Sequence, residues 1–327
     1  MFLVALIFVV FVSGPRVKFT ELERNTVLPI DIEEVQQLVE ARESQVENMR
    51  SGNKAEIIWS DTVGKKTPYS IVYIHGFSAS HEEGMPVHQT IAKQFGCNLY
   101  LSRLDGHGLV DTNAFENLTP QDLISSTEFA IEVGKALGDS VILMMCSTGS
   151  TSGIYLAAGD PEIAAMLHYS PNIDIEGESD ELLLWPWGRQ MIKLVMGGSY
   201  NRISYSEEQA KYWYGVYHVN GLLALKSMIQ NTMTPEVFNE ITQPTFMAYY
   251  YKNEQEKDPI VSVDRMLDFY NMIQTPDNQK RQIGFPNGRH VMTSHAIPSP
   301  VTEELIAETS SFLQEIVGLQ LVDSQAR

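Results

Sequence analysis

The sequence predicts an α/β fold in which helices cover both faces of a mostly parallel sheet. Short apolar runs rich in β-branched and aromatic residues alternate with amphipathic segments of helical period, a pattern typical of such sheets. A single long stretch without a convincing strand interrupts the alternation. The chain has 327 residues, 43% of them hydrophobic and 20% charged, which allows a sizeable core and excludes general disorder.

Each expected strand is a short apolar run with high β propensity. These runs are 56–61, 70–75, 98–102, 140–145, 164–169, 245–251 and 280–285. The expected helices are 31–50, 87–95, 120–137, 148–158, 262–273 and 302–318. Two of the helices begin with capping signals: Asp31 with Glu34, and Thr119 followed by proline with Asp122 in the first turn.

The order of these segments predicts the domain organisation. Residues 1–18 are expected to be a hydrophobic signal or anchor segment, and 19–54 a linker with an amphipathic helix. Residues 55–171 and 236–327 are expected to form the core domain. Residues 172–235 hold three of the four tryptophans and are expected to form a helical cap between two strands.

The N-terminal run MFLVALIFVVFV gives an expectation about location. As a helix it reaches about 18 Å, short of the ~30 Å hydrocarbon core of a bilayer. A cleaved signal, a short uncleaved anchor and a buried N-terminal element all remain open. Export or anchoring in the cell envelope, with a membrane tether through this segment, is the favoured interpretation, and a cytoplasmic location is the alternative.

The charge excludes one class of partner. With 41 acidic against 23 basic residues the formal net charge is −18, whereas phosphate binding needs a basic surface, so we expect no nucleic-acid partner. The two cysteines, Cys97 and Cys146, lack zinc-site spacing and are expected to be small packed residues. No metal or organic cofactor is expected.

A candidate nucleophile follows the apolar strand 140–145. In Met145-Cys146-Ser147-Thr148-Gly149, a strand meets a helix, as in the G-x-S-x-G elbow that exposes a serine hydroxyl. Cys146 is the rival nucleophile, but Gly149 fits only the serine register. Met145 replaces the first glycine of the motif, and an ordinary strand–turn–helix with a capping serine remains the alternative.

A candidate oxyanion hole follows an earlier strand. His75-Gly76-Phe77-Ser78 comes directly after 70–75, and we expect the N–H groups of Phe77 and Thr148 to bind a developing oxyanion. His75 and His107 are expected to hold their loops through hydrogen bonds, and His168 to be a core residue.

The acid and the base are expected after the cap, each past the end of a strand. Asp258 follows 245–251 and His290 follows 280–285, which gives the order serine, acid, histidine. The rivals for these two roles are Glu254, Glu256, Asp264 and Asp268 for the acid, and His295 for the base.

Together, the motifs HGFSAS, NLYLSRLDGHG, CSTG, SPNI and GRHV resemble the serine α/β-hydrolase superfamily, over about 55–319. More narrowly, they resemble capped monoacylglycerol-lipase-like and lysophospholipase-like hydrolases of bacterial envelopes. The resemblance implies an eight-stranded, mostly parallel sheet with a helical cap after the sixth strand. It also implies cleavage of carboxylic esters, lipid-like or otherwise apolar, by Ser147, His290 and Asp258 through an acyl-enzyme.

Other functions remain open on the same fold. A serine peptidase or thioesterase shares the machinery, and a non-catalytic binding protein shares only the fold. Epoxide and haloalkane hydrolysis are disfavoured, because they need a carboxylate where Ser147 stands. A neutral, small-molecule ester is the expected substrate.

Overall fold

The computed structural model describes residues 9–25, 29–177 and 180–322. Its strands are β1 (Glu56–Ile58), β2 (Thr67–Ile74), β3 (Asn98–Leu101), β4 (Gly138–Cys146), β5 (Ile163–Tyr169), β6 (Tyr200–Arg202), β7 (Val216–His218), β8 (Thr245–Asn253), β9 (Glu256–Lys257) and β10 (Lys280–Phe285). Its α-helices are α2 (Val35–Ser44), α3 (Val87–Phe95), α4 (Pro120–Leu137), α5 (Thr148–Ala157), α6 (Gly188–Val195), α7 (Asn220–Thr232), α8 (Pro235–Phe238), α9 (Val263–Met272) and α10 (Thr302–Phe312).

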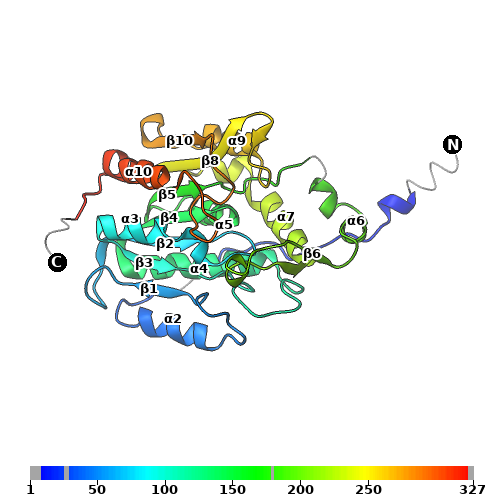
Figure 1. Cartoon of the computed structure of the whole chain (residues 1–327), viewed down its shortest axis with the longest axis horizontal. Helices are drawn as coiled ribbons and strands as arrows, with labels where there is room; N and C mark the ends of the chain where they lie inside the picture. Colours follow the sequence, from blue (N-terminus) through cyan, green and yellow to red (C-terminus); the bar gives the residue numbers. More distant parts are fainter. Residues whose placement is uncertain (1–8, 26–28, 178–179, 323–327) are drawn as a thin grey trace.

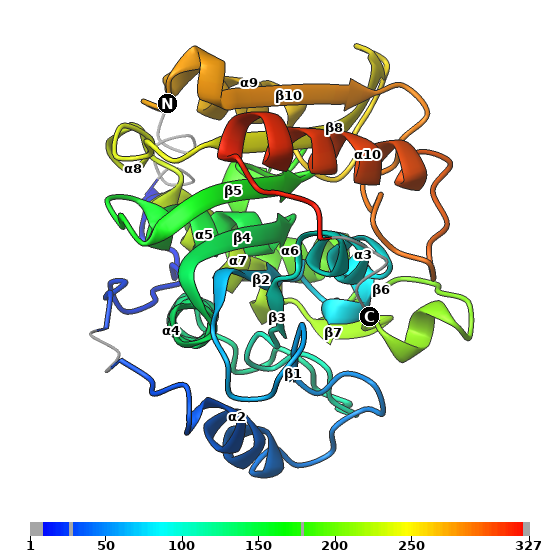
Figure 2. The ribbon, with the colours of Figure 1, turned by 90° about the vertical axis from the view of Figure 1, so that its left-hand side faces the viewer.

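Eight of the strands form one sheet, in the order β1-β3-β2-β4-β5-β8-β10, with β9 paired to β8 (Figure 2). Within this sheet, as far as the chain is described, the pairings of β1 with β3 and of β8 with β9 are antiparallel and the others are parallel. The predicted eight-stranded, mostly parallel sheet is therefore confirmed. In such a sheet the carboxyl ends of neighbouring strands lie at one edge, where ligands bind.

The sheet has a hydrophobic layer on each face, and β4 shows why its sequence is continuously apolar. Val141, Leu143 and Met145 face the layer formed with α4, α5, α7 and α9, whereas Ile142 and Met144 face the layer formed with α3 and α10 (Figures 1 and 2). Since successive side chains of a strand alternate between faces, a strand covered on both faces needs apolar residues throughout.

The predicted capping signals have different outcomes. Thr119 accepts a hydrogen bond from the Asp122 N–H, and the Asp122 side chain caps Thr119 in return, so α4 begins as predicted. The predicted helix 31–50 is too long: α2 begins at Val35, and Asp31 is not its N-cap. The Asp31 carboxylate instead accepts from the Glu33 N–H in a turn before the helix.

The end of α2 was also mispredicted, for a tertiary reason. Beyond Ser44 the chain pairs with a distant loop: Met49 forms a bridge with Leu109, and the Arg50 N–H donates to the Gly108 carbonyl at 2.9 Å. Long-range pairing of this kind overrides the local helical period.

The region between β5 and β8 departs from the prediction in two ways. It is not purely helical, because β6 and β7 form an antiparallel pair beside α6 and α7. It also follows the fifth strand of the chain rather than the sixth, because the short β9 that completes the sheet lies after it. We call residues 172–235 the cap. Figure 1 shows α6, β6 and α7 together at one end of the molecule.

Residues 1–8 of the predicted N-terminal segment 1–18 lie outside the described residues, which begin at Val9. Residues 9–12 are helical and lie against the cap: the Trp187 indole N–H donates to the Val10 carbonyl at 3.2 Å, and the ring of Phe11 lies edge-on to Trp185. Within the described residues no helix has both the length and the apolar character needed to cross a membrane.

Candidate active site

Ser147 lies in a strained turn between β4 and α5. Its φ of 48° and ψ of −115° fall outside the regions that residues with a side chain ordinarily occupy, which is characteristic of a serine raised above a sheet. Gly149 makes the turn possible: a Cβ there would lie 2.2 Å from the Ile74 carbonyl oxygen at the end of β2. The helix α5 can therefore approach the sheet only with glycine at this position.

Met145 is accommodated by a second glycine. Its side chain is fully buried, and a Cβ on Gly153, one turn further along α5 than Gly149, would lie 2.1 Å from the Met145 sulfur. The thioether therefore occupies the space that a side chain at position 153 would fill. A long residue at the first motif position is compatible with the elbow because it points into the core.

The side chains of Ser147, His290 and Asp258 form a continuous chain of hydrogen bonds. The Ser147 Oγ lies 3.2 Å from His290 Nε2, and His290 Nδ1 lies 2.8 Å from Asp258 Oδ2. The remaining oxygen, Asp258 Oδ1, accepts from the N–H groups of Ile260 at 2.9 Å and Val261 at 3.2 Å. The carboxylate is thus held in place on both sides.

Asp258 and His290 shift each other's pKa. Burial opposes the charged form of both groups, but their mutual attraction and hydrogen bond outweigh it. The pKa of Asp258 is consequently lowered and the pKa of His290 is raised. A second carboxylate, Glu83, adds to the rise in the pKa of His290.

Phe77 and Thr148, the predicted oxyanion donors, lie with Ser147 around one cavity. Neither of their N–H groups donates to another residue among those that the structure describes. The two loops are in direct contact, since a Cβ on Gly76 would lie 3.2 Å from the Ser147 Cβ.

His75 and His107 hold the loops beside the site. His75 lies 2.8 Å from the Gly76 carbonyl through Nδ1 and accepts the Leu104 N–H through Nε2, and His107 Nε2 accepts the Ser78 N–H at 3.1 Å. Burial lowers the pKa of His75 far below its ordinary value and that of His107 to about 4, so both stay neutral. His75 and His107 therefore hold their loops through hydrogen bonds, as predicted.

The rival residues are not part of the site. The carboxylates of Glu254, Glu256, Asp264 and Asp268 are solvent-exposed and pair with surface lysines or arginine. His295 is 44% exposed and lies beside Glu82. Cys146 points into the layer opposite the Met145 side and is fully buried, and burial raises the pKa of its thiol.

A cavity of about 610 Å³ opens in front of Ser147. Much of its wall is apolar and comes from the cap, through Met196, Ile203, Trp213, Tyr217, Leu222 and Leu225. The cap tryptophans serve different purposes, because Trp213 lines this cavity whereas Trp187 contacts the N-terminal segment.

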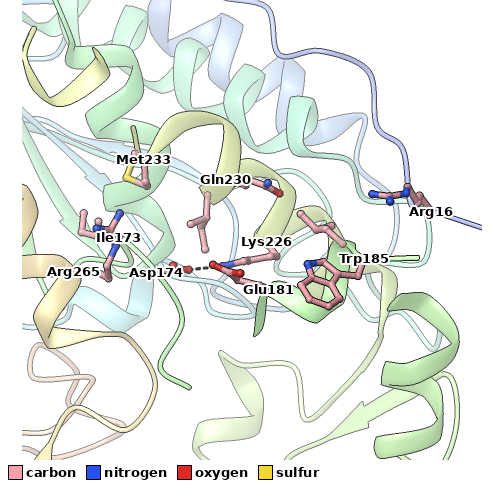
Figure 3. Close-up of a pocket in the computed structure, with 11 residues that line it drawn as sticks. Arg16, Ile173, Asp174, Glu181, Trp185, Lys226, Gln230, Met233 and Arg265 are labelled. Carbon is pink, nitrogen blue, oxygen red and sulfur yellow. Dashed lines mark hydrogen bonds and ion pairs between the residues drawn. The ribbon is translucent and has the colours of Figure 1, made fainter. Parts of the chain in front are cut away.

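A second cavity, of about 430 Å³, is lined by Lys226, Ile229 and Gln230 of α7 (Figure 3). It is bordered by Trp185 and Arg16 and contains the ion pair between Lys226 and Asp174, whose N and O atoms are 2.7 Å apart. The Asp174 carbonyl also accepts the N–H of Ser262, which follows Asp258 in the loop before α9. The pair thereby joins the cap helix to the loop that carries Asp258.

Sequence reasoning missed one residue of the site. Glu83 lines the cavity beside Ser147 and is only 2% exposed. It follows an identical residue, Glu82, in a short segment between β2 and α3, where local periodicity gives no sign of burial. Within the described residues, no cluster of three or more His, Cys, Asp or Glu residues could hold a metal ion.

Comparison with known proteins identifies the fold. No protein-family model matches the sequence, and no curated protein matches it. A structure of LipS and LipT, two metagenome-derived lipolytic enzymes, matches with a TM-score of 0.65 at 15% identity, covering 81% of this chain and 99% of that one.

Two further structures match over similar lengths. A soluble variant of monoglyceride lipase from Saccharomyces cerevisiae, in complex with a substrate analog, gives a TM-score of 0.57 at 12% identity and covers 80% of this chain and 91% of its own. Est1E from Butyrivibrio proteoclasticus, with bound ferulic acid, gives a TM-score of 0.54 at 16% identity and covers 80% of this chain and 94% of its own. Its strand order and these likenesses show that the chain has the α/β-hydrolase fold, the fold that the motifs predict.

Proposed function

We propose that this chain is a serine hydrolase that cleaves carboxylic esters with a largely apolar acyl group. The observation that carries the proposal is the hydrogen-bonded chain from Ser147 Oγ through His290 to Asp258 at the strand ends, with two backbone N–H groups beside it. The esterase and lipase names of the matching structures agree with it.

The geometry supports a two-step reaction. Ser147 Oγ attacks the ester carbonyl while His290 Nε2 takes its proton, and the Phe77 and Thr148 N–H groups hold the oxyanion. His290 then returns the proton to the leaving alcohol, which leaves an acyl group on Ser147. A water molecule deprotonated by His290 releases the acid in the second step.

The cavity supports an apolar substrate. Its volume of about 610 Å³ and its aliphatic and aromatic cap wall suit an acyl or alcohol chain rather than a charged peptide terminus. We therefore favour an ester over an aminoacyl substrate.

A panel of p-nitrophenyl esters beside aminoacyl anilides tests this proposal. Because each buried methylene contributes about 0.8 kcal/mol, kcat/KM should rise by about tenfold or more from the acetate to the hexanoate. Ser147→Ala should abolish this hydrolysis. Faster cleavage of the anilides would favour a peptidase, and no cleavage of any substrate by the wild-type protein would contradict the proposal.

The reaction should also require neutral His290. Because the pKa of His290 is raised above its ordinary value of 6.5, kcat/KM should fall as the pH is lowered through a midpoint above 6.5. A pH profile of hydrolysis measures that midpoint. A midpoint below about 6 would contradict the assigned base.

A further inference from the structure

Glu83 is a buried carboxylate that the proposed reaction does not use. It lies in the segment 81–86, between β2 and α3, and is 2% exposed. A carboxylate is rarely buried unless hydrogen bonds and opposite charges compensate for the loss of water. The hydrogen-bond partners of Glu83 therefore explain how its burial is compensated.

The Glu83 carboxylate contacts residues 75–78, the loop that carries the Phe77 N–H and that we call the oxyanion loop. Glu83 Oε2 accepts the Gly76 N–H at 2.7 Å and the Tyr73 hydroxyl at 3.3 Å. A Cβ on Gly76 would lie 2.9 Å from Glu83 Oε1 and 3.2 Å from the Ser147 Cβ. The Glu83 carboxylate and Ser147 therefore both lie beside Gly76.

The backbone around Glu83 also holds the loop of the histidine base. The Thr293 hydroxyl donates to the Glu83 carbonyl at 2.6 Å, and the His295 N–H donates to the Met85 carbonyl at 2.6 Å. Thr293 lies three residues after His290. The segment 81–86 consequently connects the oxyanion loop with the loop that carries the base.

Several titratable groups face this carboxylate. They come from separate parts of the chain: Tyr73 of β2, Cys146 of β4, Tyr205 of the cap and His290 of the loop after β10. Burial raises the pKa of Glu83, and the Gly76 N–H and the charge of His290 oppose that rise. Of the facing groups, only His290 becomes positively charged during the proposed reaction.

We propose, resting on the function proposed above, that Glu83 is a positioning residue. Its carboxylate fixes the oxyanion loop through the Gly76 N–H, which aims the N–H of Phe77, and it supplies a second negative charge in the wall of the cavity that His290 also lines. Asp258 orients the imidazole through its hydrogen bond, and the charge of Glu83 favours the protonated imidazole.

Glu83→Gln tests the role of the charge, because it keeps an oxygen that can accept from Gly76. The pKa of His290, followed by NMR of its imidazole, should fall by about one unit. The acid limb of kcat/KM should move to lower pH by the same amount. A merely structural role would lower kcat or stability and leave both values where they are in the wild type.

Glu83→Asp tests the role of the hydrogen bond, because it keeps the charge and withdraws the carboxylate by one methylene. The pKa of His290 should stay near its wild-type value, while phosphonylation of Ser147 by a fluorophosphonate should slow by about tenfold or more. The matched control is Glu82→Gln, one residue away, which should change neither quantity.

These measurements separate the two proposals. A wild-type protein that does not react with the fluorophosphonate contradicts the proposed function, whereas the NMR titration still reads the effect of Glu83 on His290. A reactive wild type whose Glu83→Gln variant keeps the His290 pKa contradicts the charge role. If that variant does not fold, an unchanged phosphonylation rate in Glu83→Asp overturns the inference.

Discussion

Replacing Asp258 with asparagine is expected to lower kcat for ester hydrolysis by about 10³–10⁴-fold while leaving the fold intact. The N–H groups of Ile260 and Val261 both donate to Oδ1, so an amide at position 258 would place its oxygen there and its NH₂ toward His290. His290 Nδ1 would then have to accept, and its proton would move to Nε2. In that tautomer His290 cannot accept the Ser147 proton.

Steady-state kinetics and thermal unfolding together check this prediction. Asp264→Asn is the matched control, because Asp264 is a 73% exposed carboxylate on α9 that pairs only with Lys257 among the described residues. The control should keep kcat within about twofold, as expected of an exposed ion pair. A kcat for Asp258→Asn within threefold of the wild type, roughly RT in free energy, would mean that Asp258 does not orient the base.

The largest effect on stability is expected at Arg103. Its guanidinium forms a two-point ion pair with Glu43 of α2, with Nε–Oε2 and Nη2–Oε1 distances of 2.8 and 2.9 Å, and the two side chains are 4% and 3% exposed. Glu43 also accepts the Ala55 N–H. Arg103→Met should lower the free energy of unfolding by about 3–5 kcal/mol, because it leaves a buried carboxylate without its counter-charge.

Urea unfolding of the variant measures this loss. Arg265→Met provides the control, since the Arg265–Asp268 pair lies on the surface and should contribute less than about 1 kcal/mol. The double variant Glu43→Met with Arg103→Met should recover much of the loss, because no uncompensated charge remains. A loss below about 1 kcal/mol for Arg103→Met would show that the pair is not structurally important.

Much of the site could be predicted because its signals are local. The apolar strand before Ser147, the glycine after it and the positions of Asp258 and His290 past strand ends are all visible in the sequence. In a parallel sheet, residues past the carboxyl ends of strands converge at one edge, so chain order is enough to bring them together.

The features that sequence reasoning missed depend on distant contacts. Glu83 is buried because the oxyanion loop and the base loop close around it, and no local pattern distinguishes it from Glu82. The pairing of Arg103 with Glu43 joins residues 60 positions apart. Likewise, α2 ends early because residues after it pair with the loop near Leu109. Such contacts follow from tertiary structure, which local propensity does not encode.

Covalent labelling with a fluorophosphonate tests most directly whether Ser147 is the nucleophile. In the reaction with a fluorophosphonate, Ser147 Oγ bonds to phosphorus, fluoride leaves, and the hydroxyl proton passes to His290. Peptide mapping by mass spectrometry should find a single phosphonyl group on Ser147 in the wild type and none in folded Ser147→Ala. Equal labelling of the two proteins, or an adduct on another residue of the wild type, would contradict the claim.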